Sequence, residues 1–84
     1  MDRQRMLDLL IRQHDWPGQY TFKFVVYEED EAELDALLEG FQTTKRRSAT
    51  GKYVSFTSKK WFLRAEEVME VYDEVGQIRR LISL

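Results

Sequence analysis

The chain of 84 residues contains no cysteine, no asparagine, one proline and one histidine. The absence of cysteine excludes disulfides, thiolate metal ligands and a thiol nucleophile. The single histidine, His14, has no second histidine or cysteine with which to bind a metal. We therefore expect His14 to have a packing or surface role, and we expect the protein to use no metal and no cofactor.

Long apolar runs are also missing from the sequence. A membrane-spanning helix needs roughly 20 apolar residues, whereas the initial stretch MDRQRMLDLLIRQHDW is repeatedly interrupted by charge. This start is neither the apolar region of a signal peptide nor a membrane span, and no later stretch is long enough. We therefore expect a cytoplasmic protein that makes no contact with a membrane.

The residues that are present suffice for one modest core. Hydrophobic residues make up 43% of the chain, and its aromatic residues are five Phe, four Tyr and two Trp. A chain of this length has room for a single domain. The net charge is only −2, but the charge is unevenly distributed, because no acid occurs between Gly40 and Ala65. The basic residues of this stretch include Lys45, Arg46, Arg47, Lys52, Lys59 and Lys60.

Periodicity predicts the elements outside this basic stretch. They are a helix over residues 2–14 with Leu7, Leu10, Ile11 and His14 on one face, a strand over 20–27 with Tyr20, Phe22, Phe24 and Val26 on one face, a helix over 31–39, a helix over 65–75 and a short strand over 78–84. Asp30 precedes Glu33 by three residues, which is the spacing of a capping box, so Asp30 is expected to cap the second helix.

The basic stretch itself predicts a hairpin over residues 45–62. Two strands are joined by a tight turn at Ala49-Thr50-Gly51, where glycine can adopt a positive φ. In the second strand, alternation places Val54, Phe56 and Phe62 toward the core. We expect the basic charges to project from the side or edge opposite the acidic helices.

Apart from the first helix, the predicted order is strand, helix, strand, strand, helix, strand. This order is typical of the ferredoxin-like α+β sandwich (βαββαβ), a four-stranded antiparallel sheet with both helices on one face. Right-handed crossovers place the first and third strands at the sheet centre. We predict an N-terminal helical extension over residues 1–15 and one ferredoxin-like domain over residues 16–84.

Several short motifs lie within this plan. They are the strand FKFVV (residues 22–26), the turn pattern S-x-x-G-x-Y-x-S at Ser48, Gly51, Tyr53 and Ser55, the pair Tyr72 and Gly76, and the ending LISL. As a set they resemble the YbeD-like family of small bacterial proteins, over about residues 16–84, and the first helix looks like an extension found in one branch. The chain departs from the family pattern at Lys52, where asparagine is common, and at Ser58 and Lys60, where aliphatic residues are expected.

The resemblance implies a ferredoxin-like fold similar to the regulatory ACT domains, which dimerise and sometimes bind amino acids. It implies no reaction. The domain over residues 16–84 is accordingly expected to be ACT-like.

Two regions are candidate binding sites. The turn around Ser48 and Gly51 could bind an anion through its amide groups and the nearby cations, or its glycine and serine could simply shape the hairpin. The outer sheet face could stack RNA bases on aromatic side chains, or a helix or second subunit could cover it. The candidate residues are Arg46, Arg47, Ser48, Thr50, Gly51, Lys52, Tyr53 and Trp61.

The sequence does not predict an enzyme. Ser48 and Ser55 have no histidine partner nearby, and the acidic runs EEDEAE and EEVMEVYDE lack metal-loop spacing and are expected to be solvated helix faces. The leading hypothesis is a non-catalytic, ACT-like regulatory or protein-interaction module that forms a homodimer. Its basic hairpin would contact an acidic protein or a small anionic, amino-acid-like effector.

The alternative is a single-stranded RNA-binding module that uses the sheet face and the basic hairpin. The acidic net charge and the missing RRM consensus argue against nucleic acid as a partner.

Overall fold

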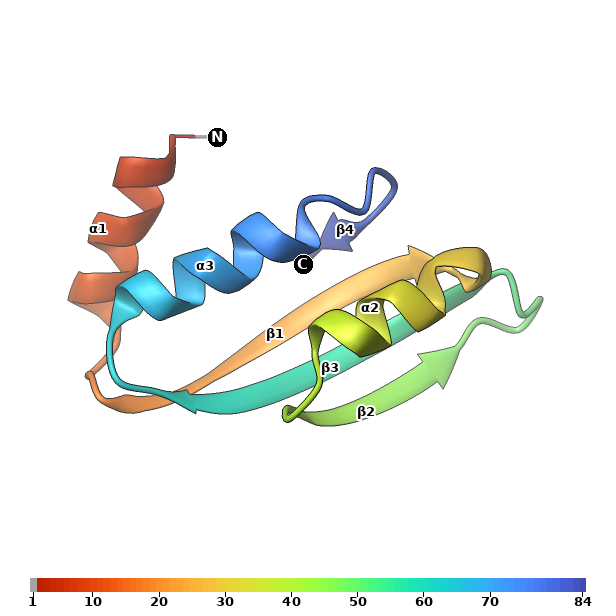
Figure 1. The fold of residues 1–84 in the computed structure, drawn as a ribbon, viewed down its shortest axis with the longest axis horizontal. Coiled ribbons are helices and arrows are strands. Elements are labelled where there is room, and N and C mark those ends of the chain that lie inside the picture. Colours follow the sequence, from red (N-terminus) through yellow and green to blue (C-terminus); the bar gives the residue numbers. More distant parts are fainter. Residues whose placement is uncertain (1) are drawn as a thin grey trace.

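The computed structural model describes residues 2–84 and shows an α+β fold (Figure 1). The elements in chain order are α1 (Arg3–Gln13), β1 (Gly18–Tyr27), the 3-10 turn η1 (Glu28–Asp30), α2 (Glu31–Leu37), β2 (Gln42–Arg47), β3 (Tyr53–Phe62), α3 (Ala65–Val75) and β4 (Ile82–Ser83). Within residues 2–84, no helix is both long enough and apolar enough to span a membrane.

The sheet is four-stranded and antiparallel, with the strand order β2-β3-β1-β4. The predicted central position of the first and third strands is confirmed, and β1 pairs with β3 over its whole length, from Gly18 opposite Phe62 to Tyr27 opposite Tyr53. The element order is not the plain βαββαβ order, because α1 precedes the first strand and η1 precedes α2.

The core lies between the sheet and the helices α2 and α3, which cover the same side of the sheet (Figure 1). The predicted inward residues of both central strands are confirmed as buried, and the list comprises Phe22, Phe24, Val26, Val54, Phe56 and Phe62. Leu34 of α2 and Val68 of α3 are fully buried against them. Alternation places every second side chain of β1 and β3 in this layer, so the opposite side of the sheet carries the others.

Helix α1 shares this core instead of standing apart from it. The carboxylate of Asp2 accepts hydrogen bonds from the amides of Gln4 and Arg5, which caps the helix. Leu10 is buried, and the indole N–H of Trp16 donates to its carbonyl over 3.0 Å. The expected apolar face is partly wrong, because Ile11 is exposed; Met6 and Leu7 pack against the core beside Leu10.

Two expectations for α2 need correction. The helix ends at Leu37, two residues earlier than predicted, and the chain turns at Gly40 with a φ of +88°. Asp30 makes no side-chain capping bond. Residues 28–30 instead form the 3-10 turn, and the carboxylate of Asp30 accepts a hydrogen bond from Arg80 at 3.1 Å.

The last strand is much shorter than predicted. A strand was expected over residues 78–84, but β4 covers only Ile82–Ser83. The amide of Ile78 donates to the carbonyl of Val75, and that of Leu81 to the carbonyl of Ile78, so two successive turns occupy this segment. Ile78 is buried in the core from a turn. Most of the outer edge of β1 therefore has no strand beside it.

Candidate functional site

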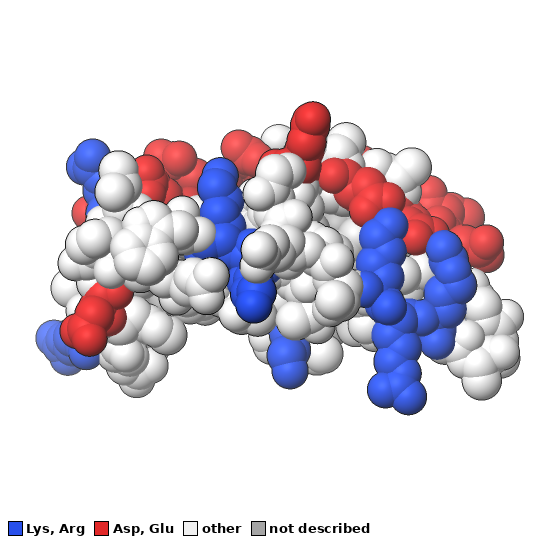
Figure 2. Space-filling model, turned by 90° about the horizontal axis from the view of Figure 1, so that it is seen from below, with Lys and Arg blue, Asp and Glu red and all other residues white. Residues whose placement is uncertain are grey.

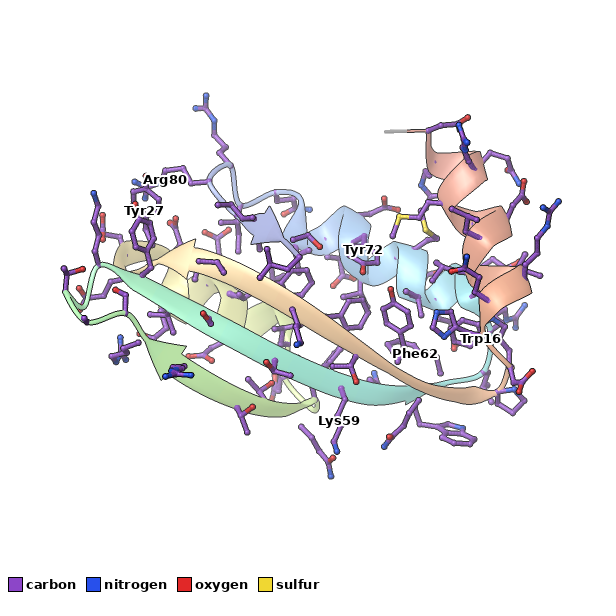
Figure 3. The ribbon with its side chains drawn as sticks, turned by 180° about the vertical axis from the view of Figure 1, so that it is seen from behind. Trp16, Tyr27, Lys59, Phe62, Tyr72 and Arg80 are labelled. Atoms are coloured by element: carbon purple, nitrogen blue, oxygen red, sulfur yellow. The ribbon has the colours of Figure 1, made fainter. Side chains whose placement is uncertain are left out.

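The side of the sheet that faces away from the helices is uncovered, and we call it the open face. Strand register places the same-side residues in rows across it. They are Gln42, Thr44 and Arg46 of β2; Ser55, Thr57, Lys59 and Trp61 of β3; Gln19, Thr21, Lys23 and Val25 of β1; and Ile82 of β4. Figure 2 views this side, and Figure 3 shows Lys59 pointing away from the helices.

The open face carries positive charge only. Its charged residues are Lys23, Arg46 and Lys59. Lys23 lies two residues from Thr21, which is directly opposite Lys59, so these two lysines are diagonal neighbours on adjacent strands. None of the ion pairs within residues 2–84 involves these three side chains. In Figure 2 the acidic side chains gather mainly along the upper margin.

The other basic residues of β2 are neutralised within the molecule. Lys45 and Arg47 point to the helix side of the sheet, opposite Phe56 and Val54. Lys45 Nζ lies 2.7 Å from Asp35 and 3.1 Å from Glu31, and Arg47 lies 2.8 Å from Glu31. The expected separation of basic hairpin from acidic helices is thus only partial, and of these cations only Arg46 faces outward.

The electrostatics of this cluster follow from its hydrogen bonds. The bonds from Arg47 and then Lys45 lower the pKa of Glu31 below its ordinary value. The bond to Asp35 is the main cause of the raised pKa of Lys45. Both effects favour the charged forms, so these residues remain paired at neutral pH and Arg47 is less available to an outside ligand.

A hollow of about 640 Å³ lies on the open face where the three longer strands meet. Its lining includes Thr21, Gln42, Thr44, Thr57 and Lys59. Hydroxyl and amide groups can donate hydrogen bonds, and the lysine adds a charge, so the hollow suits a carboxylate or another anionic group.

The turn at the end of the hairpin uses its own hydrogen-bond donors. The amides of Ser48 and Gly51 donate to the carbonyls of Tyr53 and Ser48, each over 2.9 Å. The amide of Tyr53 donates to the Ser48 hydroxyl and that of Lys52 to the Thr50 hydroxyl. Gly51 has a φ of +76°. These features are typical of a turn that shapes a hairpin, and they leave fewer donors for an anion.

Aromatic and basic side chains meet beside this turn. The rings of Tyr27 and Tyr53 lie edge to face with centroids 5.0 Å apart. Lys52 approaches both rings, and Arg80 stacks 4.2 Å from the centre of the Tyr27 ring (Figure 3). Arg80 is also held by Asp30. The sequence analysis did not single out Tyr27 or Arg80 for this cluster, because Arg80 reaches it from a turn predicted as a strand.

Trp61 is not part of that cluster. It lies eight residues from Tyr53 along β3, a separation of about 26 Å at the rise of a strand. Its side chain is 59% exposed at the far end of the open face. The predicted site residues therefore divide into a hairpin end and a distant tryptophan, with Lys23 and Lys59 between them.

Acidic side chains collect on the helix side, away from the open face. A groove of about 460 Å³ between α2, α3 and the end of β3 includes Glu67, Glu70 and Glu74 in its lining. The carboxylate of Glu67 accepts a hydrogen bond from the amide of Leu63 at 2.7 Å. Among the described residues, no cluster of His, Asp and Glu could hold a metal ion.

The core contains one polar pair that might suggest chemistry in another context. The Tyr72 hydroxyl lies 3.1 Å from that of Tyr20. Burial, followed by this hydrogen bond, raises the pKa of Tyr72 well above its ordinary value. Tyr72 therefore stays protonated at neutral pH and acts as a hydrogen-bonding group that joins α3 to β1. His14 is exposed, with its ring 5.2 Å from that of Tyr20, in keeping with a surface and packing role.

Comparison of the chain with protein-family models, with curated proteins and with solved structures finds no match. The argument for a function therefore depends on the charge and shape of the open face.

Proposed function

We propose that the protein is a non-catalytic interaction module whose open face binds an acidic surface of a partner protein. We also propose that its sheet and helices belong to the ferredoxin-like, ACT-like class suggested by the motif resemblance. The observation that carries the binding proposal is the open face itself, on which Lys23, Arg46 and Lys59 are exposed and no acid is present.

Charge complementarity determines the class of partner. Surfaces of opposite charge attract each other at a distance and are aligned as they meet, whereas like charges in contact are costly. Around the cations, threonines and Gln42 supply neutral hydrogen-bond donors. A surface rich in Asp and Glu would therefore find both its charge and its hydrogen-bonding oxygens satisfied.

The same charges bear on self-association. In a symmetric dimer each copy contributes the same patch. Two open faces packed together would bring Lys23, Arg46 and Lys59 against the same three cations. A homodimer, which remains part of the proposal, is therefore expected to use another surface and to leave the open face available.

Single-stranded RNA is the competing ligand, and two observations disfavour it. RNA-binding sheets stack bases on exposed aromatic rings at the sheet centre. Here the centre carries Lys23, Thr57 and Lys59, and Tyr27 is already stacked by Arg80. Trp61 alone presents a free ring, far from the tyrosines.

The experiment is an NMR titration of isotopically labelled protein with a glutamate-rich peptide and, separately, with oligo(U). We expect the peptide to shift the amide signals of Thr21, Lys23, Thr57 and Lys59 at low salt. The variant Lys23→Glu/Lys59→Glu should lose these shifts. The matched control Arg12→Glu/Arg79→Glu changes the net charge equally at exposed positions off the open face, and it should retain them.

Two results would overturn the proposal. Oligo(U) binding that falls steeply with salt and is abolished by Trp61→Ala, without peptide binding, would establish the RNA alternative. Peptide shifts confined to the Ser48–Lys52 turn would show that the hairpin turn, and not the open face, is the binding site.

A further inference from the structure

The outer edge of β1 is open for half of its length. β1 has ten residues, but β4 pairs with it only at Phe24 and Val25. One further bond runs from the amide of Leu84 to the carbonyl of Lys23, over 2.8 Å. Figure 3 shows β1 continuing from beneath β4 toward its start without a strand beside it.

The direction of the free main-chain groups follows from the Lys23 bond. In an antiparallel strand, the N–H and C=O of one residue point to the same side, and successive residues alternate. Because Lys23 points toward β4, Thr21 and Gln19 point to the same outer edge, while Phe22 and Tyr20 point to β3. Within residues 2–84, no hydrogen bond outside the β1–β3 ladder reaches Thr21 or Gln19, and both residues are exposed.

An apolar groove of about 610 Å³ lies above this free edge. Met6 of α1, Met69 and Tyr72 of α3, and Leu81 belong to its lining. Ser83 and Leu84, the end of the β4 segment, also line it. At its base Tyr72 is hydrogen-bonded to Tyr20 of β1. A chain that continued the line of β4 would therefore run along β1 with one side of it facing the groove.

We propose that this edge and groove bind an extended peptide segment of a partner protein, which adds a fifth strand beside β1. Addition of a strand to a free sheet edge gives affinity through main-chain hydrogen bonds and specificity through pockets for alternate side chains. This inference goes beyond the proposed function, because it concerns a different surface and depends on backbone groups instead of surface charge.

The two sides of the sheet specify the peptide. Residues that lie opposite Phe22 and Tyr20 would point into the apolar groove, and residues opposite Thr21 and Gln19 would point to the open-face side. On that side Lys23 is a diagonal neighbour of the residue opposite Thr21, at roughly 7–8 Å between backbones. The geometry therefore favours a segment in which apolar and acidic residues alternate.

The other edge of the sheet lacks these features. β2 has six residues, and three of them in a row are Lys45, Arg46 and Arg47. Consecutive basic side chains are a common device that keeps an edge strand from pairing. Its helix-side cations are occupied by α2. The β1 edge has no charged residue from Gly18 to Phe22, so nothing comparable protects it.

The test uses the synthetic peptide acetyl-Val-Glu-Val-Glu-Val-amide and amide hydrogen exchange measured by NMR on the full chain. In the free protein, the amides of Thr21 and Gln19 should exchange fast, while those of Tyr20 and Phe22 are protected by β3. At nine-tenths saturation, the peptide should slow exchange at Thr21 and Gln19 by about tenfold, because exchange then proceeds only from the free fraction.

Matched peptides separate strand addition from adsorption. N-methylation of a glutamate removes an N–H that points to β1, and it should weaken binding by about tenfold or more. N-methylation of the central valine removes an N–H that points away, and it should have little effect. The variant Lys23→Glu should bind the glutamate peptide more weakly and should prefer acetyl-Val-Lys-Val-Lys-Val-amide.

Three outcomes would overturn the inference. The first is an amide of Thr21 that is already protected in the dilute free protein. The second is protection that grows with protein concentration in the absence of peptide, since the occupant would then be a second copy of this chain. The third is equal binding by both N-methylated peptides. In none of these cases would the open-face proposal fail, since it predicts side-chain contacts on another surface.

Discussion

The hydroxyl pair of Ser58 and Thr43 allows a quantitative test of the structure. Ser58 is fully buried on the helix side of β3, where the motif resemblance leads one to expect an aliphatic residue. Its Oγ lies 2.8 Å from Oγ1 of Thr43, which is only half-buried on the edge strand β2. The two partners therefore differ in access to water, and their removal should have unequal costs.

The magnitudes follow from that asymmetry. Thr43→Val leaves the Ser58 hydroxyl buried without this partner, which should lower the free energy of unfolding by about 1–3 kcal/mol. Ser58→Ala leaves the hydroxyl of Thr43 near solvent, where water can replace the lost bond, so the cost should be about 0.5–1.5 kcal/mol. The double variant should be more stable than Thr43→Val alone, because the stranded hydroxyl is gone.

Urea unfolding followed by circular dichroism measures these differences, and each kcal/mol corresponds to about 4–8 °C in Tm for a domain of this size. Thr44→Val is the matched control, because Thr44 is the neighbouring threonine on the open face. It should change stability by no more than about 0.5 kcal/mol.

The reasoning would be refuted in either of two ways. Thr43→Val could cost no more than Ser58→Ala, which would mean that water or another group satisfies Ser58. Alternatively, the double variant could lose the sum of the single losses, which would mean that the two hydroxyls do not interact.

Three further predictions concern the core, a turn and an ion pair. Phe24→Ala removes a fully buried ring and should lower the free energy of unfolding by about 3–5 kcal/mol in urea titration; a loss below about 1 kcal/mol would contradict its place in the core. Gly51→Ala puts a side chain on a residue with a φ of +76° and should cost about 1–2 kcal/mol in the same assay. The folded-state pKa of Glu31 is lowered, chiefly by Arg47, so its stabilising effect is present above its unfolded pKa of about 4.5 and is lost as the pH falls through the folded value. A carboxyl NMR titration should show this low pKa and its rise in Arg47→Gln, and an unchanged pKa would argue against the pair.

The sequence predicted the central part of the fold well. The alternation in residues 20–27 continues without a break, and its aromatic and β-branched residues leave little choice of buried face, so the burial of Phe22, Phe24 and Val26 was predictable. The helix α3 has the predicted bounds, Ala65–Val75, because an apolar repeat of helical period ends there at Gly76. Strong periodicity is a local signal that tertiary packing reinforces.

The C-terminal segment was not predictable in the same way. The residues from Ile78 to Leu84 have the apolar composition of a strand, yet short turn bonds from Ile78 to Val75 and from Leu81 to Ile78 take up half of the segment. An apolar run of this length does not distinguish a buried strand from a turn that inserts one side chain into the core. That difference decides whether the edge of β1 is covered, so the candidate peptide site could not be derived from sequence.

The charge of the open face is a consequence of strand register, which composition does not reveal. Lys45, Arg46 and Arg47 are adjacent in the sequence, but alternation sends the first and third to α2 and the second to the open side. A slip of one residue in β2 would reverse this arrangement: it would expose two cations and leave Glu31 with a single partner. Exposed ion pairs contribute little to stability individually. Their more important effect here is to favour the one register in which the acids of α2 are matched, and that register leaves the open face with Arg46 beside Lys23 and Lys59 as its unpaired cations.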